Sequence, residues 1–111
     1  MKKIFQGDIA YVKLNNEQFD KLLNGKEFKG QKIDNFLIAH GESGNHHTIT
    51  ANKKGTVEVM DIGNGIFGIK INGRATITHE KHKPEKTLTK GLWFASRKTE
   101  YDPIGERMVS D

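Results

Sequence analysis

The chain has 111 residues, enough for one folded core and too few for two, so we expect a single domain over residues 1–111. Hydrophobic residues make up 34% and charged residues 29% of the chain, which predicts a lean core. Cysteine is absent, which excludes disulfides and thiolate metal sites and is typical of a reducing cytoplasm. The net charge of +4 leaves two interpretations: partners that carry phosphate groups, such as a small molecule or a nucleic acid, or dispersed lysines that only keep a small domain in solution.

Membrane association is not expected. No stretch approaches the roughly 18 apolar residues that a membrane-spanning helix needs. The basic start at Lys2 and Lys3 lacks the apolar run that follows it in a signal peptide. We therefore expect a cytoplasmic protein, and the sequence indicates no particular oligomeric state.

The N-terminal quarter of the chain predicts one strand and one helix. Residues 8–14 alternate between two faces, which is typical of a β-strand. Asn15 or Asn16 then suits the N-cap position of a helix. Apolar residues follow at helical spacing until Gly25, so a short helix is predicted over residues 16–24.

The rest of the chain predicts a series of short strands. Asn64-Gly65 is typical of a two-residue hairpin turn, because both residues tolerate a positive φ. Beyond about residue 103 we expect a flexible tail. About seven strands with one short helix predict a mainly β fold, either a small antiparallel β-barrel or a two-layer sandwich. The later strands are expected at residues 35–40, 46–51, 56–62, 66–72, 74–79 and 92–101.

Histidines occur at the ends of three predicted strands. Side chains two residues apart share a face of a strand. Counted in this way, His40, His47 and His79 each continue the apolar row of their own strand. We predict that these imidazoles meet at one edge of the fold, with His82 in the adjoining loop.

The residues leave three interpretations of these four histidines open. Neutral imidazole is a common ligand for zinc and similar divalent metals, which predicts a metal site, with Glu42 or Glu80 as a fourth ligand or as a catalytic base acting on metal-bound water. Without a metal, a histidine pair can perform acid–base catalysis on a phosphodiester, or hold a phosphate. In the third interpretation the histidines pair with backbone carbonyls and are structural.

The last predicted strand combines aromatic and basic residues. Arg97 and Tyr101 are candidate ligand-binding residues at its end. Aromatic side chains between basic ones can stack nucleobases on a sheet face. Trp93 or Phe94 filling the core is the simpler alternative.

Three segments resemble a small, functionally unassigned family of bacterial and phage proteins. They are residues 40–47 (HGESGNHH), 78–82 (THEKH) and 100–103 (EYDP). Members of that family typically open with a Gly-Asp strand, and their histidine segments usually read HGE-x-x-GH-x-H and HE-x-H. Here Asn45 stands where that pattern often has His. The resemblance implies a site at the four histidines and a phage or prophage origin, but no activity.

Three functional hypotheses follow from the sequence. The first is a histidine-rich site that binds a divalent metal or a phosphate-bearing ligand, with metal-assisted phosphoester hydrolysis as the reaction. The second is a non-enzymatic module that binds a nucleotide or nucleic acid, or sequesters a host factor. The third is a structural or interaction protein.

Overall fold

A computed structural model describes residues 2–7, 9–40, 46–79 and 85–97. These residues form ten strands and one helix, which confirms the predicted mainly β class. In chain order the elements are β1 (Lys3–Gln6), β2 (Ile9–Leu14), α1 (Asn16–Leu23), β3 (Gln31–Ile33), β4 (Asn35–His40), β5 (His46–Ala51), β6 (Val57–Gly63), β7 (Ile66–Ile71), β8 (Ala75–His79), β9 (Lys86–Leu88) and β10 (Gly91–Arg97).

The strands form two antiparallel sheets. The larger sheet has the order β1-β2-β10-β7-β6-β3, and the smaller has the order β4-β5-β8-β9. The sheets face each other as a sandwich and do not close into a barrel, so the sandwich alternative is the one confirmed. The sequence did not predict β1 and β9, because three or four residues are too few to show a period of two.

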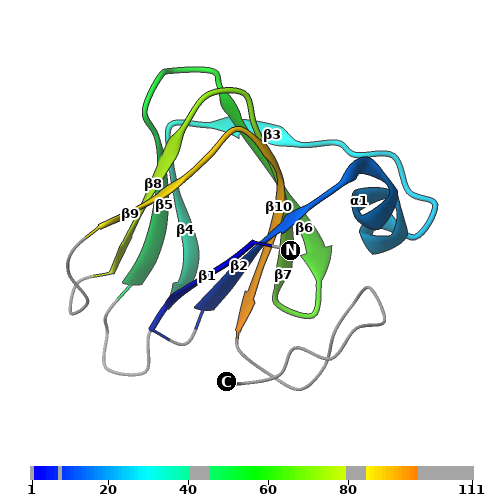
Figure 1. Ribbon diagram of the computed structural model, residues 1–111, viewed down its shortest axis with the longest axis horizontal. Coiled ribbons are helices and arrows are strands. Elements are labelled where there is room, and N and C mark those ends of the chain that lie inside the picture. The colour runs from blue at the N-terminus through cyan, green and yellow to red at the C-terminus, as the bar shows by residue number, and fades with distance from the viewer. Residues whose placement is uncertain (1, 8, 41–45, 80–84, 98–111) are drawn as a thin grey trace.

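The larger sheet is covered on both faces. Figure 1 shows it between the smaller sheet on one side and α1 on the other. Tyr11 and Trp93 belong to the core between the sheets, whereas Val12 and Phe94 pack with the helix residue Phe19 on the opposite face. Successive residues of β2 and β10 are therefore buried on alternate faces, as strand geometry requires.

The helix begins and ends at polar signals in the sequence. The Asn15 side chain accepts a hydrogen bond from the Gln18 backbone N–H at 2.8 Å, and the Asn15 N–H donates to Gln18 Oε1 at 2.9 Å. Asn24 has a φ of 51° and caps the C-terminus in the left-handed conformation, one residue earlier than predicted. Among the described residues, no helix is long and apolar enough to cross a membrane.

Candidate functional site

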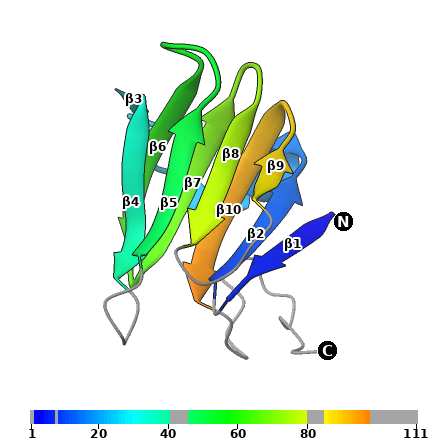
Figure 2. The same ribbon diagram turned by 90° about the vertical axis from the view of Figure 1, so that its left-hand side faces the viewer.

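The histidine positions of β4, β5 and β8 meet at one end of the smaller sheet. β5 lies between the other two strands, and its His47 is the direct partner of His79 on β8. On the other side of β5, His46 is the partner of His40 on β4. These positions lie at the lower ends of the three strands in Figure 2. The backbone therefore brings four histidines into neighbouring positions. One histidine pair lies across β4 and β5, and the other lies across β5 and β8.

A β-bulge changes how His40 relates to this group. The register of β4 against β5 shifts between Leu37 and Ala39, so His47 pairs with Ala39 and His40 pairs one residue further along, with His46. The prediction for His40 assumed that residues two apart share a face along the whole of β4. A bulge adds one residue to one strand of a pair and interrupts that count, so the expected unbroken alternation does not hold in β4.

His47 lies inside the sandwich. Its exposed fraction is 1%, and Ile49, two residues later on the same strand, is fully buried. The prediction that His47 continues the apolar row of its strand is thus confirmed. The imidazole belongs to the end of the space between the sheets and not to the outer surface.

Two further buried polar side chains are Gln6, which is linked to the histidine end, and Tyr11, which belongs to the core between the sheets. Gln6 Nε2 donates to the backbone oxygen of Ile77 at 3.1 Å, which links β1 to β8 two residues before His79. Among the described residues, neither Gln6 Oε1 nor the Tyr11 hydroxyl has a hydrogen-bond partner, although both are buried. Burial raises the pKa of the Tyr11 hydroxyl far above its ordinary value. Oxygens of this kind are usually satisfied by water or by a ligand.

The structure also brings Arg97 to this end. Ile9 pairs with Gln6 on one side and with Arg97 on the other. Arg97 is exposed and ends β10 in the larger sheet, on the row that contains Gln6. The candidate ligand-binding residue is therefore at the histidine end of the sandwich.

The remaining predicted site residues lie outside the described part of the chain. These are Glu42, Glu80, His82 and Tyr101. Where side chains are described, no group of three His, Cys, Asp or Glu residues that could hold a metal is found, and the side chains of His40 and His79 are not among those described.

The aromatic residues of the last strand do not offer a stacking surface. Trp93 is fully buried and Phe94 is 1% exposed. The Trp93 indole N–H donates to the Thr89 backbone oxygen at 2.9 Å, which fixes the ring inside the core. The core alternative is thus confirmed for both residues, and neither ring is available to stack on a nucleobase.

A second polar site lies on the larger sheet and was not predicted. It is a groove of about 430 Å³, in which Lys32, Lys70 and Lys90 are lining residues together with Glu58. Each lysine belongs to a different segment of the chain. Only the pairing of distant strands makes them neighbours, so no local pattern in the sequence indicates this groove.

Comparison of the chain with protein-family models, curated proteins and solved structures found no match in any of the three. The family resemblance of the histidine segments therefore stays a prediction. The functional interpretation depends on the arrangement of the residues themselves.

Proposed function

We propose that this protein binds a divalent transition-metal ion such as zinc at the histidine end of the smaller sheet. The observation that supports the proposal is the direct pairing of His47 with His79. Directly opposite residues of an antiparallel pair have Cβ atoms about 4.5–5.5 Å apart. This spacing suits two imidazoles that bind one ion at about 2.0–2.1 Å each.

Further ligands come from the neighbouring positions. His82 follows His79 by three residues, whereas His40 pairs with His46, one position along β5 from His47 and on the alternate face of the strand, so His40 is not counted as a ligand. Glu42 and Glu80 supply carboxylates close in sequence to these histidines. Three histidines with a carboxylate or water complete the tetrahedral geometry that zinc prefers.

The buried Gln6 Oε1 favours this proposal over purely structural histidines, because the same side chain bonds to Ile77, two residues before His79. A core end that served only for packing would be apolar, because each unsatisfied buried polar atom costs about 1–3 kcal/mol. Polar atoms at the histidine end favour a site that contains water or a ligand.

We further propose that the bound metal activates water for phosphoester hydrolysis, with Glu42 or Glu80 as the base. Substitution of the responsible glutamate by Gln is expected to abolish hydrolysis of bis-p-nitrophenyl phosphate while the metal stays bound. Full metal occupancy without any hydrolysis by the unsubstituted protein would overturn the hydrolytic step alone.

The metal site is tested by titration of tag-free, metal-free protein. Co²⁺ is followed by its visible absorption and Zn²⁺ by calorimetry. We expect one equivalent to bind. His47→Gln and His79→Gln should each weaken binding by roughly 100-fold, because the loss of even an outer partner of a metal ligand costs about 10- to 100-fold.

The matched control is His46→Gln, which removes an imidazole one residue from His47. It should bind metal like the unsubstituted protein. Circular dichroism shows whether each variant is folded, and His79→Gln provides the answer if the buried His47 position does not tolerate glutamine. Absence of stoichiometric metal, or equal affinity in His79→Gln and His46→Gln, would contradict the proposal.

A further inference from the structure

The groove on the larger sheet is built on one row of cross-strand partners. Leu92 on β10 pairs with Lys70 on β7, which pairs with Glu58 on β6, and Glu58 in turn pairs with Lys32 on β3. Their neighbours along the strands, such as Val57, Val59, Ile69 and Ile71, belong to the core between the sheets. Because side chains alternate, this row lies on the outer face of the sheet, the face that carries α1.

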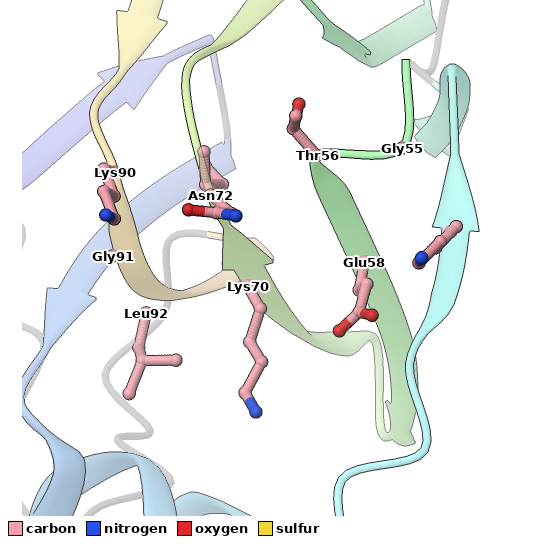
Figure 3. Close-up of a pocket in the computed structure, with 10 residues that line it drawn as sticks. Gly55, Thr56, Glu58, Lys70, Asn72, Lys90, Gly91 and Leu92 are labelled. Atoms are coloured by element: carbon pink, nitrogen blue, oxygen red, sulfur yellow. The ribbon is translucent and has the colours of Figure 1, made fainter. Parts of the chain in front are cut away.

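Turns at one end of the sheet close the groove from above. Thr56 and Asn72 are held together by a backbone hydrogen bond, in which the Asn72 N–H donates to the Thr56 oxygen at 2.7 Å. Lys90 comes from the turn between β9 and β10. Figure 3 shows Lys70 and Glu58 projecting from neighbouring strands, with Asn72 and Lys90 at the upper margin of the same hollow.

The charge of the groove is predominantly positive. Its lining includes three lysines and one glutamate, a sum of +3 and −1 that leaves +2. Lys32, Lys70 and Lys90 are all exposed, so their ammonium groups are free to reorient. Lys70 Nζ lies 5.0 Å from the centre of the Phe28 ring, which is a cation–π contact, and Glu58 is the direct cross-strand partner of Lys70 and offsets part of its charge.

We propose that this groove binds a small polyanion with two linked phosphate groups, the chemistry of a diphosphate. The volume of about 430 Å³ is within the range of small-molecule sites, about 300–1,000 Å³. Lys32 and Lys70 are two strands apart, which places their backbones on the order of 10 Å from each other. Two linked phosphates between flexible lysine side chains fill that distance better than a single phosphate does.

The lining also distinguishes a small polyanion from a nucleic-acid strand. Proteins that hold single strands combine basic grooves with aromatic side chains on which the bases stack. The described lining contains Leu92 and Ile71 as its large apolar residues and no aromatic one, and the neighbouring Phe28 ring packs against Phe19 and Lys70. The geometry thus favours recognition of phosphate groups without stacking of bases.

The test measures binding of inorganic pyrophosphate to metal-free protein by calorimetry at low salt. The absence of metal separates this site from the histidine end. Lys70→Gln and Lys90→Gln should each weaken binding about tenfold, the typical effect of one lost charge-assisted hydrogen bond. The matched control is Lys21→Gln on α1, an exposed lysine that does not line the groove. It makes the same change in net charge and should leave the affinity nearly unchanged.

Glu58→Gln provides a change of opposite sign. Removal of the one carboxylate in the described lining should strengthen pyrophosphate binding about threefold to fivefold, which a purely structural role would not produce. Binding too weak to detect, equal affinities of Lys70→Gln and Lys21→Gln, or weaker binding by Glu58→Gln would overturn the proposal. Tighter binding of a single-stranded oligonucleotide that depends on the same lysines would replace the small polyanion with a nucleic acid.

Discussion

The Tyr11 hydroxyl is a polar group on a residue of the apolar core between the sheets. Its side chain is fully buried, and its hydroxyl has no partner among the described residues. An unsatisfied buried hydroxyl costs about 1–3 kcal/mol, so Tyr11→Phe should raise the free energy of unfolding by about 1 kcal/mol in urea titrations. A loss of stability instead would indicate that the Tyr11 hydroxyl is hydrogen-bonded in the folded protein.

The same residue predicts a difference in pH dependence between the two proteins. Burial raises the folded-state pKa of Tyr11 above its ordinary value of 10.0. Below that pH both states are protonated, and above it only the unfolded state loses the proton. The free energy of unfolding therefore falls as the pH rises above about 10, by up to about 1.4 kcal/mol per pH unit. Tyr11→Phe lacks this component, so parallel stability curves above pH 10 would contradict the assignment.

At the scale of single elements, α1 depends on its N-terminal cap. Asn15 and Gln18 satisfy each other's backbone N–H groups, and the helix has only eight residues. Asn15→Ala should lower the free energy of unfolding by about 1 kcal/mol in urea titrations, whereas Asn15→Asp should retain most of it because aspartate also accepts the hydrogen bond. Equal losses in the two variants would show that the cap does not stabilise the helix.

The turn and the helix cap were predictable because each depends on only a few consecutive residues. Asn64 and Gly65 have φ values of 55° and 74° and form the turn between β6 and β7, as the Asn-Gly pair predicted. For the same reason a helix cap was predicted at Asn15 or Asn16, and it lies at Asn15. The bulge in β4 was not, because the apolar pattern of residues 35–40 gives no sign of where an extra residue enters the pairing with β5.

At the scale of the whole molecule, the two candidate sites lie at opposite ends of the sandwich. His47 begins the pairing of β5 with β8, and the other end of β5 leads toward the turns that close the lysine groove. The four steps from His47 to Ala51 alone span on the order of 13 Å. This exceeds the Debye length of about 8–10 Å at moderate salt, so charges at one end are largely screened from the other.

This arrangement predicts that the two sites act independently at about 0.15 M salt. His47→Gln or His79→Gln should leave pyrophosphate affinity unchanged, and Lys70→Gln should leave Co²⁺ affinity unchanged, because distant sites that share no partners behave additively. Each affinity is measured separately by the titrations described above. A parallel loss of both affinities in one folded variant would show that the ends are coupled.

The sequence by itself determined the mainly β class, the short helix with an asparagine cap at residue 15 or 16, the Asn64-Gly65 hairpin and the burial of His47, since each follows from spacing or turn chemistry within one segment. Only the tertiary structure decided that the sheets form a sandwich, that His79 lies opposite His47, and that three distant lysines share a groove. The physical reason is that hydrogen bonding between strands joins residues far apart in the chain. Period-two alternation says which face a residue occupies, and it carries no information about which strand lies beside it.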